Sequence, residues 1–132
     1  MNLLLDTHAL LWFMAGSEQI TSLARHQIEA PSNQVFVSIV TLWEIAIKTS
    51  LGKLTLAQPI DILLPHQLDL NGFHILSIEP EHTFQVARLP FHHRDPFDRL
   101  LIAQAMVDHM EIVSRDSLFD AYLFERGLHR IW

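Results

Sequence analysis

Cysteine is absent from this chain of 132 residues. Its absence excludes disulfide frameworks, thiolate zinc sites, iron–sulfur clusters and cysteine nucleophiles. A chain without disulfides needs no oxidising compartment, so the cytoplasm is the expected location.

The sequence also lacks a long hydrophobic run. No stretch reaches the about 18 uninterrupted apolar residues of a membrane-spanning helix. The apolar run at residues 3–5 has no basic segment before it and meets Asp6 directly, unlike a signal peptide. We expect no membrane partner and no export.

Basic residues do not outnumber acidic ones in this sequence either. Nine Lys and Arg against fifteen Asp and Glu give a formal net charge of −6. This balance argues against a protein that holds nucleic acid by counterion release alone. A phosphate-rich partner would need the help of a metal ion.

The composition present is that of a folded protein, with 49% hydrophobic and 18% charged residues. The length suits one domain, and the chain contains no internal repeat and no stretch typical of a linker. We therefore expect a single domain over residues 1–132.

Short apolar segments alternate with segments of helical pattern. The expected strands are residues 3–5, 35–39, 73–78, 112–114 and 129–132. The expected helices are about residues 7–14, 22–30, 41–51, 60–70, 81–89, 97–109 and 117–124. This alternation predicts an α/β fold, a three-layer α/β/α sandwich around a mostly parallel sheet. Such sheets bind ligands beyond the carboxyl ends of their strands.

Acidic residues follow the expected strands or begin the helices beyond them. Asp6 ends the first strand, Glu44 lies in the helix after the second, and Asp116 follows the fourth. Asp98 lies in the first turn of a helix whose next apolar residues continue the same face. Carboxylates at one sheet edge repel one another unless a cation lies among them, and oxygen ligands select Mg²⁺ or Mn²⁺.

Each of these acids also has a purely structural interpretation. Asp6 and Asp116 suit the N-cap of a helix. Glu44 stands three residues after Thr41, the spacing of a capping box, and four before Lys48, the spacing of a helical ion pair.

The acids on either side of Pro96 can be told apart. Proline suits the first helical position, so Asp95 is the expected N-cap and Asp98 lies in the first turn. Asp98 is therefore the better candidate for a site.

Four fragments in this order resemble the PIN-domain ribonucleases, in particular the VapC-like toxins of bacterial toxin–antitoxin pairs. The fragments are residues 4–12 (LLDTHALLW), 37–45 (VSIVTLWEI), 95–103 (DPFDRLLIA) and 112–116 (IVSRD). The resemblance implies a PIN-like α/β/α sandwich and a Mg²⁺- or Mn²⁺-dependent endoribonuclease. It also implies a homodimer and a cognate antitoxin that blocks the groove.

Carried over residue by residue, the resemblance places the catalytic, metal-binding acids at Asp6, Glu44, Asp98 and Asp116. Asp6 and Asp98 are expected to be the principal ligands of the first ion. Thr7 and Ser114 are implied as auxiliary hydroxyls, although threonine is commoner in the family where Ser114 stands.

Three arginines lie near the acids in the sequence: Arg94, Arg99 and Arg115. They are candidates for contacts with RNA phosphates, and Arg99 and Arg115 are equally candidates for pairing with a neighbouring carboxylate.

Several other residues are interpreted as structural. The spacing of His92 and His93 suits no zinc motif, so both are expected in a solvated loop. Trp12 and Trp43 have the helical spacing of core residues, although base stacking is also open to them, and His8 is expected beside the site.

Two other classes of function compete with the nuclease. A haloacid-dehalogenase-like phosphatase needs a second aspartate where this chain has His8, and a receiver domain needs a late lysine, which is missing. A catalytically silent PIN-like module that binds RNA or a partner stays open, although such a module has no need for a repulsive acidic cluster.

Overall fold

A computed structural model describes all residues from 1 to 132. Its centre is a five-stranded sheet in the order β3-β2-β1-β4-β5, in which every neighbouring pair is parallel. The strands are β1 (Asn2–Leu5), β2 (Gln34–Ser38), β3 (His74–Leu76), β4 (Glu111–Val113) and β5 (Arg130–Ile131). The predicted mostly parallel sheet is confirmed.

Seven α-helices and one 3-10 helix surround the sheet. They are α1 (Thr7–Ala15), α2 (Ser22–Glu29), α3 (Ile39–Ser50), α4 (Ile60–Leu70), α5 (Pro80–Arg88), α6 (Pro96–Asp108), η1 (Ser117–Phe119) and α7 (Asp120–Phe124). Pro80 and Pro96 each occupy the first helical turn, as expected for residues that lack an N–H. No helix has both the length and the apolarity to cross a membrane.

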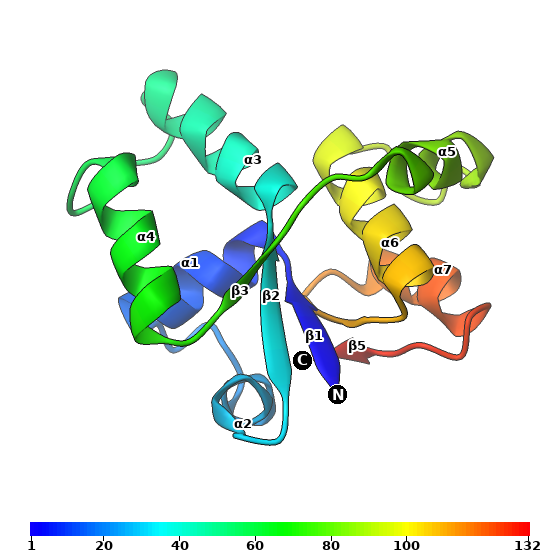
Figure 1. The fold of residues 1–132 in the computed structure, drawn as a ribbon, viewed down its shortest axis with the longest axis horizontal. Helices are drawn as coiled ribbons and strands as arrows, with labels where there is room; N and C mark the ends of the chain where they lie inside the picture. The colour runs from blue at the N-terminus through cyan, green and yellow to red at the C-terminus, as the bar shows by residue number, and fades with distance from the viewer.

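Helices cover both faces of the sheet. Successive residues of β1 point to opposite faces, so Leu4 packs in one core with residues of α6 and α7. Leu3 and Leu5 pack in a second core with residues of α1, α2 and α4. Figure 1 shows the two helical groups on either side of the strands. The predicted three-layer α/β/α sandwich is confirmed.

Helix α3 begins two residues earlier than expected. Ser38, the last residue of β2, is itself the N-cap, and its Oγ accepts the N–H of Val40 at 3.0 Å. Thr41 therefore lies inside the helix, and the capping box predicted for Thr41 and Glu44 is wrong. The Ser38 hydroxyl also donates to Oε1 of Gln104 at 2.6 Å, which joins α3 to α6.

Strand β1 lies at the point where the strand order reverses. The chain continues from β1 to β2 on one side and reaches β4 on the other. The N–H of Asp6 donates to the carbonyl of Val113 at 3.1 Å, which extends the ladder one residue past β1. Such a switch point brings the loops that follow several strands together and is the usual ligand site of an open parallel sheet.

Candidate functional site

Two of the candidate acids lie at the start of α1 and within α3. The buried Asp6 caps α1, since its Oδ1 accepts the N–H of Ala9 at 2.8 Å. The buried Glu44 accepts the hydroxyl of Thr7 at 2.7 Å on Oε1, and its Oε2 lies 2.5 Å from Nζ of Lys48. Both structural interpretations, the Asp6 cap and the ion pair of Glu44 with Lys48, are confirmed.

The other two candidate acids meet at a histidine. Nε2 of His93 lies 3.0 Å from Oδ2 of Asp98 and 2.8 Å from Oδ2 of Asp116. Asp116 also caps η1 by accepting the N–H of Leu118, and Asp95 caps α6 as predicted. These caps hold the loops before η1 and α6 in place beside the histidine.

His93 is buried, so the solvated loop predicted for it is wrong. The backbone N–H of His93 donates to Oη of Tyr122 at 2.8 Å. The His93 ring packs against the ring of Phe119, with centroids 5.7 Å apart. The contact with Asp116 spans 23 positions of sequence. No local spacing in the sequence could have revealed a partner so distant.

The hydrogen bonds of His93 define its tautomer. Nδ1 accepts the N–H of Asp95 at 3.2 Å, so it carries no proton. The single proton of the neutral ring is then on Nε2 and faces Asp98 and Asp116. His93 therefore acts as a hydrogen-bond donor to both carboxylates.

Burial and neighbouring charge raise the pKa of two carboxyls. Desolvation, followed by the charge of Asp95, raises the pKa of Asp98 to about 7 despite the opposing effect of His93, and the charges of Asp6 and Glu44 add to the rise. Burial also raises the pKa of Asp6, against the side chain of Ser114 and the N–H of Ala9. Asp6, Glu44 and Asp98 are thus close enough to influence one another electrostatically.

This donor set fits a hard divalent cation. One ligand atom each from His93, Asp98 and Asp116 lie within 4.8 Å of one another. Because Nε2 of His93 carries the ring proton, the donors that remain are carboxylate oxygens, which suit Mg²⁺ or Mn²⁺. Burial is the main cause of the two raised pKa values, and repulsion between the carboxylates adds to it; a cation would offset both effects.

The two candidate auxiliary hydroxyls lie beside the acids. The Thr7 hydroxyl donates to Glu44, as described above, and is buried. Ser114 is fully buried, and its Oγ accepts the N–H of Asp116 at 2.9 Å. Each hydroxyl thus fixes the position of a candidate acid.

Arg99 does not face the acids, which corrects its place among the candidate RNA contacts and carboxylate partners. Its guanidinium is buried and donates to backbone carbonyls of the segment before α6. The acceptors are Val86, Leu89, Pro90 and His93, at 2.9 to 3.3 Å. With its donors occupied in this way, Arg99 holds the loop that carries His93.

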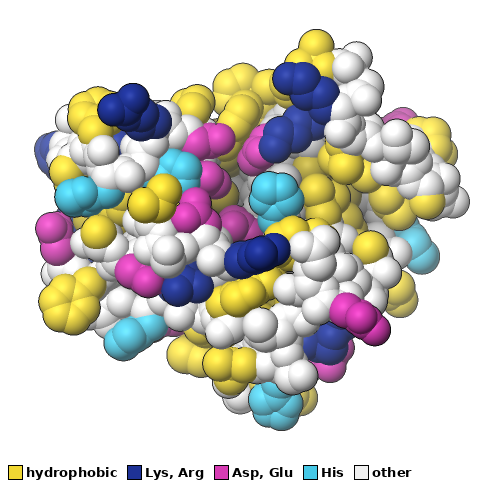
Figure 2. Space-filling model, turned by 180° about the vertical axis from the view of Figure 1, so that it is seen from behind, with side chains coloured by type: hydrophobic (Ala, Val, Ile, Leu, Met, Phe, Trp, Pro, Cys, Tyr) yellow, Lys and Arg dark blue, Asp and Glu magenta, His cyan; other side chains and the backbone are white.

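The other two candidate arginines are at the surface. Arg94 is exposed and has no carboxylate partner. Arg115 is also exposed, donates to Oε1 of Gln19 at 3.2 Å, and lies over the ring of Trp12 at 5.9 Å. Figure 2 shows acidic side chains gathered near the middle of one face, with histidine and Lys or Arg side chains around them.

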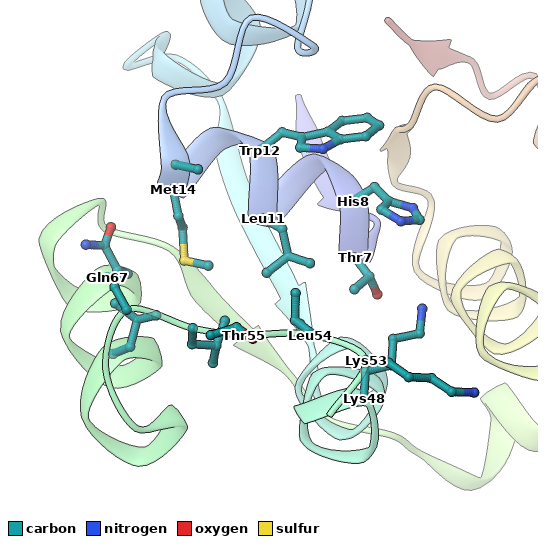
Figure 3. A pocket seen from close by; sticks show the side chains of 14 residues that line it. Thr7, His8, Leu11, Trp12, Met14, Lys48, Lys53, Leu54, Thr55 and Gln67 are labelled. Atoms are coloured by element: carbon teal, nitrogen blue, oxygen red, sulfur yellow. The ribbon is translucent and has the colours of Figure 1, made fainter. Parts of the chain in front are cut away.

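Two cavities open beside the acids. One, of about 500 Å³, is lined by Asp6, His8, Trp12, Arg115, Asp116 and Ser117. The other, of about 550 Å³, lies between α1, α4 and the segment after α3 and is mostly apolar. Figure 3 shows Thr7 and His8 at the end of this second cavity near Lys48 and Lys53, with Gln67 at the opposite end.

Neither candidate core tryptophan is fully buried. Trp12 is half-buried and lines both cavities. Trp43 is 56% exposed and touches Phe97 edge to face, so its assignment to the core is wrong. The buried face of α3 consists of Val40, Thr41, Glu44 and Ile45, and Trp43 lies on the exposed face.

This chain matches one protein family by sequence and several solved structures by fold. The model of the PIN domain matches residues 3–124. A chain in the crystal structure of VapBC2 from Rickettsia felis bound to a promoter DNA fragment has a TM-score of 0.73 at 14% identity, with 100% of both chains covered.

Two further structures have the same fold. One is VapBC-1 from nontypeable Haemophilus influenzae, with a TM-score of 0.67 and 13% identity over 98% of this chain and 96% of that chain. The other is a toxin–antitoxin complex from Klebsiella pneumoniae, with a TM-score of 0.56 and 18% identity over 87% of each chain. A comparison with curated protein sequences finds no match.

Proposed function

The chain belongs to the PIN-domain family, and we propose that it is a Mg²⁺- or Mn²⁺-dependent endoribonuclease. The observation that carries the proposal is the meeting of acids from distant parts of the sequence at one edge of the sheet. Asp6, Glu44 and Asp98 influence one another electrostatically, and His93 joins Asp98 to Asp116. Such a cluster is costly without a cation, and a divalent cation would activate water for the hydrolysis of a phosphodiester.

Asp6 and Asp98 are the proposed direct ligands of the cation, with Glu44 and Asp116 completing the site directly or through water. When bound, a divalent cation neutralises charge on the phosphate and lowers the pKa of a water molecule that attacks phosphorus. Hydroxyl groups of the chain hold two of these acids, Glu44 and Asp116, in position to bind the cation. Thr7 orients Glu44, and Ser114 fixes the backbone at Asp116.

His93 has a positioning role in this proposal. Its Nε2–H holds the Oδ2 atoms of Asp98 and Asp116 on one side, which leaves Oδ1 of Asp98 for the cation. Arg99 fixes the backbone carbonyl of His93 and so keeps the ring in place.

We further propose that this nuclease is the toxin of a toxin–antitoxin pair in the cytoplasm, with a cognate antitoxin as partner. The VapBC complexes that share its fold support this role. A homodimer is the proposed state of the free protein. It is supported by Ile39 and Trp43, exposed apolar side chains one turn apart on α3.

The test is cleavage of a mixed pool of structured and unstructured RNA by the purified protein in Mg²⁺, Mn²⁺ or EDTA. The key variant is Asp98→Asn, and the matched control is Asp95→Asn. Asp95 is an exposed acid three residues away, and asparagine keeps its capping role. We expect metal-dependent products from the wild type and Asp95→Asn, and none from Asp98→Asn.

Products in EDTA, or equal activity of the Asp98→Asn variant, would contradict the proposal. A folded, antitoxin-free protein that binds RNA without cleaving it in either metal would identify the chain as a catalytically silent binding module. Light scattering on the same preparation measures the mass and tests the homodimer.

A further inference from the structure

The rings of His8 and Trp12 form an exposed stack one turn apart on α1. Their centroids are 5.2 Å apart and their planes differ by 25°. Trp12 also meets the ring of Trp132 at 5.7 Å and lies under Arg115, whereas His8 is exposed. A ring already fixed by several neighbours loses little conformational freedom when a ligand covers the stack.

This His8–Trp12 stack borders both cavities. On one side lies the cavity of about 500 Å³, which contains Asp6 and Asp116. On the other lies the cavity of about 550 Å³, which begins at Thr7. A flexible ligand that covers the stack therefore extends to the acids in one direction and into an apolar cavity in the other.

Cationic side chains flank the stack although the chain as a whole is acidic. The two lysines of the sequence, Lys48 and Lys53, both line the larger cavity, and Figure 3 shows them near Thr7 and His8. Arg115 lines the smaller cavity. Lys48 is paired with Glu44, but neither Lys53 nor Arg115 has a carboxylate partner. These two cations are free to meet an anionic ligand.

We infer that the His8–Trp12 stack receives an unpaired base of single-stranded RNA, while Arg115 and Lys53 meet phosphates on its two sides. Aromatic rings bind bases of any sequence by stacking, and flanking cations follow the strand. A base within a duplex is already stacked on its neighbours and cannot cover these rings. The inference rests on the proposed nuclease function and adds a subsite to it, in which the His8–Trp12 stack holds one base beside the acids.

A protein segment is the other class of ligand that an apolar cavity would accept. The free cations on both sides of the stack favour a polyanion over an apolar segment, because they lie where the phosphates next to a stacked base would be. The smaller cavity is lined by two acids and Arg115, with Trp12 as its one hydrophobic residue.

The experiment measures the affinity of a fluorescent single-stranded RNA of mixed sequence by anisotropy. All variants carry Asp98→Asn so that the RNA stays intact in Mg²⁺. We expect His8→Ala to weaken binding about tenfold, since stacking of one base contributes an effect of this size, and His8→Phe to keep it. His26→Ala, which removes an exposed histidine of α2, is the control and should leave the affinity unchanged.

A second measurement follows tryptophan fluorescence in the same titration. RNA should quench the wild-type signal, and Trp12→Phe should lose most of the quenching while it keeps the affinity. Trp43→Phe, a change at the exposed tryptophan of α3, should keep the quenching.

If the protein with both His8→Ala and Asp98→Asn binds RNA as tightly as the protein with Asp98→Asn alone, the inference is overturned. The stack would then be a surface for a protein segment. Equal affinity for a blunt RNA duplex and for the single strand would overturn the inference as well. If the wild type cleaves no RNA but His8→Ala still weakens single-strand binding tenfold, the nuclease proposal fails and the stack inference stands.

Discussion

Nε2 of His93, in the loop before α6, lies 2.8 Å from Oδ2 of Asp116, in the loop after β4. The same nitrogen lies 3.0 Å from Asp98 on α6. A neutral ring thus connects the loop before α6 with the loop after β4. One side chain thus contacts two candidate ligands from different elements and fixes their relative position.

His93→Ala should weaken Mn²⁺ binding by about 10- to 100-fold, the usual effect of losing a hydrogen-bond partner of a metal ligand. His93→Gln should lose less, because its amide N–H can still reach a carboxylate. Isothermal titration calorimetry measures both affinities. His92→Ala changes the exposed neighbour and serves as the control. Unchanged affinity in His93→Ala would show that the carboxylates hold their places without the ring.

The metal-free protein should lose stability as the pH rises. The pKa of Asp98 is about 7 in the folded state, against the ordinary 3.8 in the unfolded chain. Between these values only the folded state holds the proton, so the free energy of unfolding falls as pH rises from about 4 to about 7 and stays low above it. The raised pKa of Asp6 acts in the same direction.

Asp98→Asn should therefore stabilise the metal-free protein at pH 8, by an amount on the order of 3 kcal/mol, and make its stability less dependent on pH. Urea unfolding in EDTA at pH 5 and pH 8 measures the difference. Asp61→Asn removes an exposed acid of α4 and should have almost no effect. A wild type that is more stable at pH 8 than at pH 5 would contradict this reasoning.

Arg99→Met should destabilise the fold by about 3 kcal/mol. The variant keeps the buried aliphatic stem but removes the donors to four backbone carbonyls, and unpaired buried acceptors are costly. Urea unfolding measures the loss, and Arg94→Met, at an exposed site, should cost less than about 0.5 kcal/mol. Equal stability of the two variants would mean that water replaces the guanidinium.

Thr7→Val should destabilise the protein by about 1 to 2 kcal/mol, because the valine leaves one oxygen of the buried Glu44 without its donor. Thr7→Ser keeps the hydroxyl and should recover most of the loss. Thermal unfolding with and without Mn²⁺ tests both variants. Similar losses in the two would indicate that the methyl group, rather than the hydrogen bond, matters at this position.

The fold was accessible from sequence because its elements follow local patterns. The buried strand before Asp6 and the proline before Asp98 both indicate where helices begin, and the structure agrees. The sequence predicts the start of α3 two residues too late, because Ser38 has the β-branched neighbours of a strand and yet caps the helix itself. One residue thus belongs to both elements, a case that local propensity cannot resolve.

The site was less accessible, because its connections are long-range. The sequence points to the acids at the strand ends, but it places His93 in solvent and gives Arg99 either an RNA phosphate or a neighbouring carboxylate as its partner. Both assignments depend on partners 6 to 23 positions away, which no periodic pattern encodes. The partial exposure of Trp12 could not be predicted either, since helical spacing marks a face of the helix without saying how much of that face another element covers.

The central position of β1 also affects when the acids come together. This strand is the first of the five to be synthesised, and one of its two neighbours, β4, is the fourth. Pairings between segments so distant in the sequence close slowly. A nascent chain on the ribosome therefore carries Asp6 and Glu44 before Asp116 exists, and the full acidic cluster forms only after β4 has been synthesised.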